Sequence, residues 1–226
     1  MKRPLICATL TAKHRDQIPP LADMAIAQGA DLLELRADYL SDYEGIDRSI
    51  LSLGLPIILT LRRREEGGRF KGSEENRLNL LLGIAGKGFK YVDIELSTPS
   101  LLRIVDKLKD IGLDVIISYH NFNLTPSRGS MLSIVKRQIG AGADVCKLVT
   151  KARDVSDNLS CLGLFSEVGR AKLVCFAMGE LGAPSRILSP LFGAPFTYAS
   201  VSGGSVAAPG QLPVHSMRKI YELMGL

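Results

Sequence analysis

Residues 115–149 contain the unit that decides the fold: VIISYHNFNLTPSRGSMLSIVKRQIGAGADVCKLV. Its two ends, Val115–Ser118 and Val145–Val149, are short and almost continuously apolar, as expected of strands covered on both faces of a parallel sheet. Between them, Met131–Ile139 has the pattern of an amphipathic helix, and Gly142-Ala143-Asp144 marks a turn. The stretch therefore predicts a strand, a helix and a second strand parallel to the first.

The same unit recurs along the whole chain. The predicted strands are Leu5–Leu10, Leu32–Leu35, Ile57–Leu61, Tyr91–Leu96, Val115–Ser118, Val145–Val149, Leu173–Ala177 and Phe196–Ser200. The predicted helices include Gln17–Gln28, Glu74–Gly86, Leu101–Ile111, Met131–Ile139 and Asn158–Glu167, and helix-start signals lie at Ser73, Thr98-Pro99 and Thr125-Pro126. Eight such strands predict an α/β fold, a single (β/α)8 TIM barrel that forms one catalytic domain over residues 1–226. A doubly wound open sheet is the alternative, but no G-x-G-x-x-G motif follows the first strand.

Composition narrows the classes of protein that remain. Hydrophobic residues make up 46% of the chain, which is enough for a large core. The net charge of +5 favours an anionic partner, either a small acid or nucleic acid. Because aromatic residues make up only 6% and tryptophan is absent, stacking surfaces for single-stranded nucleic acid are scarce, and no nucleic-acid partner is expected.

The termini and the cysteines indicate the cellular compartment. The first apolar run, Leu5–Leu10, is too short for a signal peptide or a membrane span. Cys7, Cys146, Cys161 and Cys175 include no C-x-x-C pair, so we expect buried free thiols in a reducing compartment. The sequence thus predicts a cytoplasmic protein without a membrane partner.

Charged residues stand at the carboxyl ends of several predicted strands. Glu34 and Arg36 close the second strand, and Arg62 follows the third. Because side chains alternate across a strand with a period of two, Glu34 and Arg36 lie on the same face. Barrel enzymes build their sites from residues at these strand ends, so the charges predict an active site in the barrel mouth.

Lys147 lies inside an apolar run, where a lysine is costly unless it is paired or functional. A structural salt bridge is one interpretation. The other is an amine nucleophile, surrounded by arginines, that attacks a carbonyl carbon. His120 ends the preceding strand; alone it is most simply structural, but beside Lys147 it can transfer protons near neutral pH. No set of histidine, cysteine and aspartate has metal-ligand spacing, so no metal site is expected.

Three loops at the predicted mouth complete the candidate site. The charged segment Thr60–Gly68 is either a solvated turn or, given its position at the mouth, a loop that offers an arginine for an anion and a carboxylate that can orient a base. In Met178–Arg186, small residues let the backbone approach a ligand, and Ser185 is expected to open a short helix whose amino end supports carboxylate binding by Arg186. The small-residue stretch Ser202–Gln211 predicts a lid whose Gln211 bonds a hydroxyl or carboxylate.

Taken in order, these pieces resemble the type I 3-dehydroquinate dehydratases of the shikimate pathway, over nearly the full length of the chain. The matching motifs are Glu34-x-Arg36, Thr60-x-Arg62-x-x-x-Glu66-Gly67-Gly68, Ser118-Tyr119-His120-Asn121-Phe122, Lys147-Leu148, Met178-Gly179 with Ser185-Arg186, and Ala208-Pro209-Gly210-Gln211. Each motif alone is weak, but six in order at predicted strand ends are specific.

The resemblance implies a dehydration that needs no metal and no cofactor. Lys147 would form a Schiff base with the ring ketone of 3-dehydroquinate. His120 would remove a proton from the adjacent carbon and then protonate the departing hydroxyl, while Glu66 orients it. The product would be 3-dehydroshikimate, and the family suggests a homodimer.

The resemblance also implies the substrate contacts. Arg186 and Gln211 would hold the carboxylate, and Glu34, Arg36 and Arg62 would bind the ring hydroxyls and position the ring. One position departs from the family pattern, which has a serine four residues before the glutamine. Ala207 occupies that position here, so Ser205 is the candidate replacement.

Two other functions fit part of this pattern. A class I aldolase or transaldolase would also use a lysine on the sixth strand, but a sugar-phosphate enzyme should carry a phosphate-binding glycine loop after strands seven and eight. A non-catalytic anion-binding protein, including one that binds nucleic acid, should gather its basic residues in a stripe. Here most of them are scattered over the predicted helices.

Overall fold

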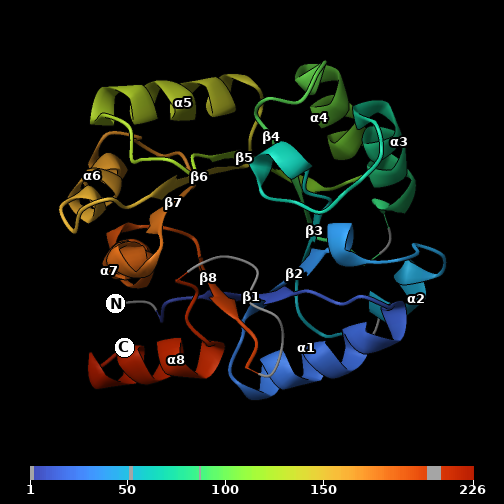
Figure 1. The fold of residues 1–226 in the computed structure, drawn as a ribbon, viewed down its shortest axis with the longest axis horizontal. Coiled ribbons are helices and arrows are strands. Elements are labelled where there is room, and N and C mark those ends of the chain that lie inside the picture. The colour runs from blue at the N-terminus through green and yellow to red at the C-terminus, as the bar shows by residue number, and fades with distance from the viewer. Residues whose placement is uncertain (1–2, 51–52, 87, 203–209) are drawn as a thin grey trace.

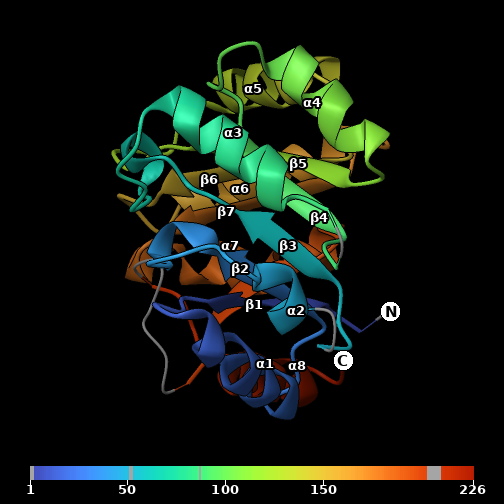
Figure 2. The same ribbon diagram turned by 90° about the vertical axis from the view of Figure 1, so that its right-hand side faces the viewer.

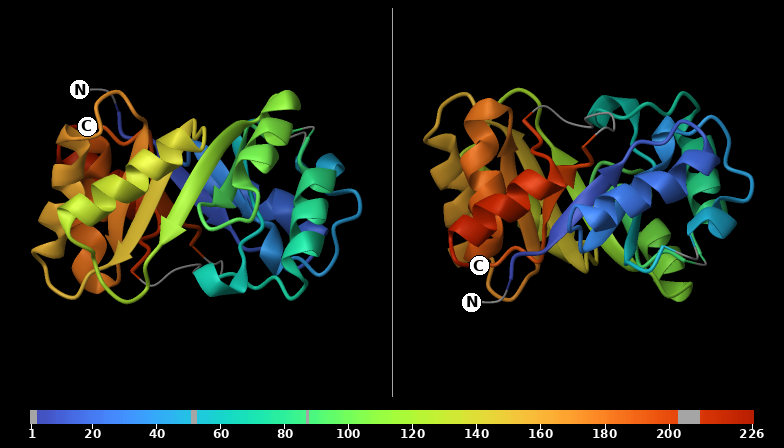
Figure 3. Two further views of the ribbon diagram at one scale, coloured as in Figure 1. Left: turned by 90° about the horizontal axis from the view of Figure 1, so that it is seen from above. Right: turned by 90° about the horizontal axis from the view of Figure 1, so that it is seen from below.

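All eight predicted strands are present, and their ends lie within two residues of the predicted ends. The computed structural model describes residues 3–50, 53–86, 88–202 and 210–226. The strands are β1 (Ile6–Leu10), β2 (Leu32–Arg36), β3 (Ile57–Thr60), β4 (Tyr91–Glu95), β5 (Asp114–His120), β6 (Val145–Lys151), β7 (Leu173–Met178) and β8 (Thr197–Ser200). All their pairings are parallel, and Figure 3 shows the arrowheads pointing to one end of the molecule.

The strands follow one another around a nearly closed barrel in the order β7-β6-β5-β4-β3-β2-β1-β8. This sequential order confirms the predicted TIM barrel and excludes the doubly wound sheet, in which the strand order reverses. Within the described residues no ladder joins β7 to β8. Side chains bridge this seam instead: the ring centroids of Phe176 and Tyr198 lie 6.3 Å apart, and the Thr197 hydroxyl donates to the main-chain oxygen of Arg186 (2.8 Å).

Helices surround the barrel, with α1 beside α8 and α3 beside α4 (Figures 1 and 2). They are α1 (Ile18–Ala27), α2 (Ile46–Ile50), α3 (Glu74–Ile84), α4 (Leu101–Asp110), α5 (Arg128–Gly140), α6 (Asp157–Gly163), α7 (Ala183–Leu188) and α8 (Val214–Leu223). Their apolar faces cover outward-facing strand residues such as Leu33, Leu59 and Val92. The predicted helix Asn158–Glu167 is divided into α6 and a 3-10 helix, Leu164–Ser166.

Each of the three predicted helix-start signals precedes a helix, and the predicted start of α4 at Leu101 is confirmed. Ser73 caps α3, since its hydroxyl accepts the N–H of Asn76 (3.2 Å). The signals at Thr98-Pro99 and Thr125-Pro126 lie two residues early, because Ser100 precedes α4 and Ser127 caps α5. Each of these helices begins two residues after the proline, so neither proline occupies the first helical position.

The barrel interior changes from apolar to polar along each strand. On β2 the inward residues are Leu32 and then Glu34, and on β6 they are Val145 and then Lys147. The apolar side chains at the amino ends form one cluster, which includes Cys7, Leu32, Ile58, Ile116, Val145, Val174 and Phe196. This cluster is the floor on which the polar carboxyl ends rest, so the period-two alternation of each strand sets the depth of the site.

Two further predictions can be compared with the fold. All four cysteines are free and buried, as predicted. Within the described residues, no helix has both the length and the apolar character that crossing a bilayer requires.

Candidate active site

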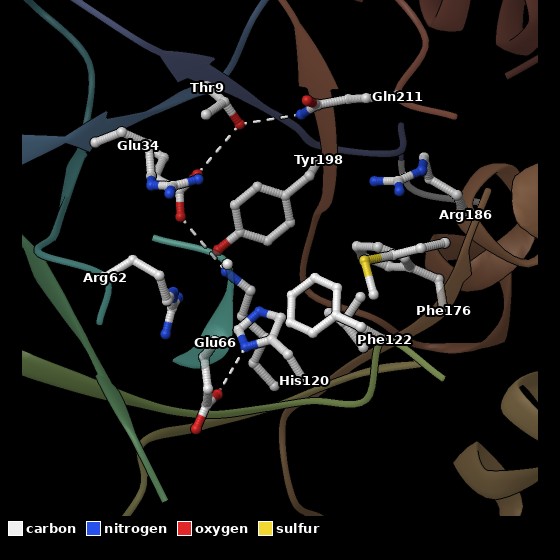
Figure 4. A pocket seen from close by; sticks show the side chains of 15 residues that line it. Thr9, Glu34, Arg62, Glu66, His120, Phe122, Phe176, Arg186, Tyr198 and Gln211 are labelled. Carbon is white, nitrogen blue, oxygen red and sulfur yellow. Dashed lines mark hydrogen bonds and ion pairs between the residues drawn. The ribbon is translucent and has the colours of Figure 1, made fainter. Parts of the chain in front are cut away.

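The carboxyl ends of the strands enclose a pocket of about 590 Å³, counting its open mouth. Its lining comprises Thr9, Glu34, Arg36, Arg62, Glu66, Gly67, His120, Phe122, Lys147, Val149, Phe176, Met178, Arg186, Tyr198 and Gln211 (Figure 4). Eight of the nine predicted site residues are among them. The ninth, Ser205, lies outside the described residues, as do residues 203–209 of the predicted lid.

Lys147 is both paired and turned toward the pocket, so its two interpretations are not exclusive. Its Nζ donates to Oδ2 of Asp93 (2.8 Å) and to Oε1 of Glu34 (3.4 Å). The same Nζ lies 4.1 Å from the ring centroid of Tyr198, and only 5% of the lysine is exposed. Its direct partners are carboxylates and an aromatic ring, whereas the sequence suggested arginines.

Asp93 connects Lys147 to the rest of the site. Its Oδ2 also binds Nη2 of Arg62 (2.8 Å), and its Oδ1 accepts the hydroxyl of Ser118 (2.6 Å). Burial by itself raises the pKa of the Asp93 carboxyl, but Arg62 and Lys147 outweigh it and hold that pKa well below its usual range. Asp93 is therefore a fixed negative charge beneath the amine.

The ion pairs continue outward from Arg62 to α3. Nη1 of Arg62 donates to Oε1 of Glu95 (2.9 Å) and to the hydroxyl of Ser118 (2.7 Å). Oε2 of Glu95 lies 2.9 Å from Nη1 of Arg77, which is fully buried and also binds Glu74. Charges thus alternate from the outside of the barrel to Lys147, and both terminal nitrogens of Arg62 are bonded to protein groups.

Glu34 is fixed by hydroxyl groups from the neighbouring strands. Its Oε1 accepts the Thr60 hydroxyl (3.0 Å) and its Oε2 accepts the Thr9 hydroxyl (3.2 Å). Nε2 of Gln211 in turn donates to the Thr9 hydroxyl (3.1 Å; Figure 4). These bonds connect β1, β2 and β3 to the segment after β8.

Arg36 is held by a carboxylate two residues further along the chain. Its Nε and Nη2 donate to the two oxygens of Asp38 (2.8 and 2.9 Å), and Asp38 also accepts the N–H of Arg69 (2.9 Å). A two-point bond of this kind fixes the guanidinium plane. Arg36 can therefore present its remaining edge to the pocket at a defined angle.

His120 and Glu66 form the proton-transfer pair of the site. Nδ1 of His120 lies 3.0 Å from Oε2 of Glu66, whose Oε1 accepts the Ser97 hydroxyl (2.8 Å). With Glu66 ionised, Nδ1 carries the proton and the other ring nitrogen is left as an acceptor toward the pocket (Figure 4). Phe122 stacks beside the imidazole, with the two ring centroids 6.1 Å apart and an angle of 20° between the ring planes.

The surroundings of His120 favour its neutral form. Burial first, and then the positive charges of Arg62 and Lys147, lower the pKa of His120 well below 6.5. Burial raises the pKa of the Glu66 carboxyl, and the positive charge of Arg62 only partly offsets this rise. A neutral imidazole can accept a proton at neutral pH, which a general base requires.

Arg186 differs from the other arginines of the pocket. It is 2% exposed, and within the described residues its Nε and Nη2 have no hydrogen-bond partner. Its guanidinium carbon lies 4.2 Å from the ring centroid of Phe176, and burial lowers the pKa of Arg186 to about 10, which leaves it charged at neutral pH. A buried cation without an anion is costly, so this position favours an anionic ligand.

The prediction that Ser185 opens a helix is wrong. α7 begins at Ala183, after Gly182, and Ser185 lies inside the first turn. Its hydroxyl donates to the Gly182 oxygen (3.0 Å) and accepts the N–H of Ala177 (3.0 Å). These bonds attach α7 to β7 and thereby hold the backbone of the following residue, Arg186.

Several functional neighbours escaped the sequence argument. Asp93 and Glu95 alternate with apolar residues inside Tyr91–Glu95, so the reasoning applied to Lys147 would have found them. Tyr198 carries no such signal, because a tyrosine is common in a buried strand. Among the described residues, no group of three or more histidine, cysteine, aspartate or glutamate side chains is arranged to hold a metal ion.

Comparison with known proteins agrees with this geometry. The family model for type I 3-dehydroquinase matches residues 6–226. The chain belongs to this family. It is 39% identical over 221 residues to the 3-dehydroquinate dehydratase of Dehalococcoides mccartyi (strain ATCC BAA-2266 / KCTC 15142 / 195), covering 98% of this chain and 96% of that protein. The predicted family and enzyme class, a 3-dehydroquinate dehydratase of the shikimate pathway, are thereby confirmed.

Solved structures give the same result for the fold. The 3-dehydroquinate dehydratase from Geobacillus kaustophilus HTA426 superposes with a TM-score of 0.90 at 28% identity, covering 98% of this chain and 91% of that one. The enzyme from Aquifex aeolicus VF5 gives 0.80 at 31% identity, covering 97% and 98%. The similarity of the fold to these solved structures and the match to the family model therefore indicate the same family.

Proposed function

We propose that Lys147 is the amine that forms the Schiff base with 3-dehydroquinate and that His120 moves the protons of the dehydration. One observation carries this proposal: a buried amine and a neutral imidazole line the same pocket, each with its own carboxylate partner. The family gives the reaction, and the pocket supplies one nucleophile and one base for it.

The reaction begins when Nζ of Lys147, after losing a proton, attacks the carbon of the ring ketone. The carbinolamine that results loses water and becomes an iminium, which withdraws electrons from the adjacent carbon. His120 takes the proton from that carbon and then returns a proton to the hydroxyl that departs as water. Hydrolysis of the iminium releases 3-dehydroshikimate and restores the lysine.

Glu66 is proposed to orient His120 and to stabilise its protonated form. The 3.0 Å bond to Nδ1 and the bond from Ser97 to the same carboxylate support this role. As the imidazole accepts a proton, Glu66 becomes the partner of the new positive charge. Removing the carboxylate should therefore slow proton transfer more than it weakens substrate binding.

The substrate carboxylate is proposed to bind Arg186 and Gln211. The unpaired Nε and Nη2 of Arg186 support this assignment, because an anion would remove the cost of burying them. Glu34, Arg36 and Arg62 are proposed to position the ring and its hydroxyls. Arg62 would do so partly through Asp93, since its terminal nitrogens are already bonded.

Three further features belong to the proposal. Residues 1–226 act as one catalytic domain, Ser205 contributes a substrate contact in place of the serine expected at position 207, and the enzyme is a cytoplasmic homodimer. Light scattering on the purified protein tests the last point, because a monomeric mass at micromolar concentration would contradict it.

Reductive trapping tests the mechanism. The protein is incubated with 3-dehydroquinate and borohydride, and the intact mass and the modified peptide are determined. We expect a substrate-dependent adduct on Lys147 that is lost in Lys147→Ala. Lys151→Ala is the matched control, because Lys151 lies four residues further along β6 and is not among the lining residues. A folded wild-type protein that forms no adduct, or forms it elsewhere, would contradict the covalent mechanism.

A further inference from the structure

Tyr198 lies directly beside the proposed nucleophile. It belongs to β8, lines the pocket and is 4% exposed, and its ring faces Nζ of Lys147 at 4.1 Å. Its hydroxyl is buried, and within the described residues it has no hydrogen-bond partner. Figure 4 shows the hydroxyl directed toward the centre of the pocket, on the side of Glu34 and Arg62 rather than of Arg186.

A second buried tyrosine shows what an ordinary structural hydroxyl does in this fold. Tyr221 on α8 is 1% exposed, and its hydroxyl donates to the main-chain oxygen of Ile187 (2.8 Å). Buried polar groups are nearly always bonded, since an unbonded one has lost its water without compensation. The unpaired hydroxyl of Tyr198 therefore requires an explanation that the fold does not supply.

We propose that the Tyr198 hydroxyl donates a hydrogen bond to the ketone oxygen of the substrate as Lys147 attacks, and retains it on the carbinolamine. This inference rests on the proposed function. The attacked carbon becomes bonded to Nζ, so its oxygen lies only two bonds from Nζ. The Tyr198 ring centroid lies 4.1 Å from Nζ and its hydroxyl is directed toward the centre of the pocket, so that oxygen forms beside this tyrosine (Figure 4).

The chemistry of the step requires such a donor. As the bond from Nζ to carbon forms, the electron pair of the C=O double bond moves to oxygen, and negative charge develops there. Donors that face this oxygen stabilise the transition state more than the ground state. The two terminal nitrogens of Arg62 are also hydrogen-bond donors near this position, but both already bind protein groups.

Tyr198 acts in this step as a donor and not as an acid. Burial raises the pKa of its phenol well above 10, so the proton stays on the tyrosine. His120 takes the proton that Nζ loses before the attack and gives it to the negatively charged oxygen. It then takes a second proton from the newly attached nitrogen, which gives the neutral carbinolamine. When His120 returns that proton to the oxygen, the oxygen leaves as water and the nitrogen lone pair forms the iminium.

Tyr198→Phe isolates the hydroxyl, because phenylalanine keeps the ring that faces the lysine. The rate of adduct formation is measured in a single turnover, with borohydride quenching at successive times and intact mass as the readout. We expect formation to be at least about 100-fold slower than in the wild-type protein. The melting temperature should stay the same or rise by about 2–4 °C, since an unbonded buried hydroxyl has been removed.

Tyr221→Phe is the matched control, with the opposite expected result. Its melting temperature should fall by about 2–4 °C because a bonded hydroxyl is lost, and its rate of adduct formation should equal that of the wild-type protein. A substrate deuterated at the carbon that loses its proton gives an independent readout. In Tyr198→Phe the isotope effect on kcat should fall toward 1, because carbinolamine formation has become the slower step.

The outcomes separate the inference from the function on which it rests. Wild-type adduct formation with an equal rate in Tyr198→Phe would overturn the role of the hydroxyl and leave the Schiff base intact. A lower melting temperature in Tyr198→Phe with an unchanged rate would assign the hydroxyl to the fold and overturn the inference as well. Absence of any adduct in the folded wild-type protein would overturn both proposals.

Discussion

Two walls of one pocket differ in how their polar groups are satisfied. The paired wall, on β2 to β6, consists of Glu34, Arg62, Asp93 and Lys147, and each charge has an oppositely charged or hydroxyl partner within the protein. The open wall, at β7, β8 and the segment after it, consists of Arg186, Tyr198 and Gln211. On the open wall, buried polar atoms lack partners within the described residues.

The difference indicates which wall is complete before the substrate arrives. Buried ion pairs hold their members in one geometry, which suits groups that must meet a reacting atom at a fixed distance. Unpaired buried groups raise the free energy of the empty enzyme, and a ligand that bonds them removes that cost. We therefore expect loss of a charge on the paired wall to cost stability, and loss of a group on the open wall to cost a bond to the substrate: to its carboxylate at Arg186 and Gln211, and to its ketone oxygen at Tyr198.

The largest expected effect is on the paired wall. Lys147→Ala should reduce kcat by at least about 10⁴-fold, because the covalent route is removed and the residual rate comes from binding and electrostatics alone. It should also lower stability, since Glu34 loses its cation and Asp93 keeps only Arg62. The rate of 3-dehydroshikimate formation and urea unfolding measure the two effects. A variant that retained a tenth of the wild-type kcat would show that Lys147 is not the nucleophile.

Arg62→Met should produce the largest loss of stability. Removing this arginine leaves the buried carboxylates of Asp93 and Glu95 without their shared partner, which costs about 3–5 kcal/mol in the free energy of unfolding. Urea unfolding followed by circular dichroism gives the value. A loss below about 1 kcal/mol would mean that the paired wall is not preorganised by its ion pairs.

Arg186→Met is the matching change on the open wall, and we expect it to weaken substrate binding without lowering stability. Because Nε and Nη2 of this guanidinium have no hydrogen-bond partner among the described residues, the free energy of unfolding should stay the same or increase. KM should rise about 100-fold, near 2–3 kcal/mol of lost binding to the substrate carboxylate. Steady-state kinetics measure KM, and urea unfolding measures the free energy of unfolding. A destabilisation as large as that of Arg62→Met would show that the two walls do not differ in this respect.

The pH dependence should be the smallest effect. Because the pKa of His120 is lowered in the folded protein, the acid limb of kcat/KM should lie below pH 6.5. Phe122→Ala opens the imidazole to water and should move this limb upward, toward 6.5. Phe192→Ala, which removes another exposed phenylalanine, should leave the profile unchanged; a limb that Phe122→Ala failed to move would show that this ring does not desolvate His120.

The same histidine predicts the direction of the stability change with pH. As pH falls below 6.5, the unfolded chain binds a proton before the folded chain does, so unfolding becomes more favourable. The contribution of His120 is fully present above 6.5 and is lost as pH falls toward the folded pKa, at about 1.4 kcal/mol per pH unit. Urea midpoints between pH 7 and 5, compared with His120→Asn, isolate this contribution.

Much of the molecule could be predicted from the sequence. The apolar runs locate all eight strands, and the period-two alternation places Glu34 and Arg36 on the inward face. Both signals depend on residues a few positions apart, where backbone geometry allows few arrangements. The two X-Pro signals lie outside the helices that they precede: α4 begins after Ser100, and α5 begins after Ser127, whose hydroxyl caps it.

By itself, then, the sequence determined a barrel of eight strands and a ring of polar residues at its mouth, since each feature follows from local periodicity. Only the tertiary structure decided which of those residues are partners. Lys147 meets Asp93 and Glu34, which lie 54 and 113 residues away along the chain, while Nε and Nη2 of Arg186 and the hydroxyl of Tyr198 meet no hydrogen-bond partner among the described residues. Ion pairs and hydrogen bonds depend on ångström-scale distances between side chains, and those distances exist only once the strands have closed around one axis.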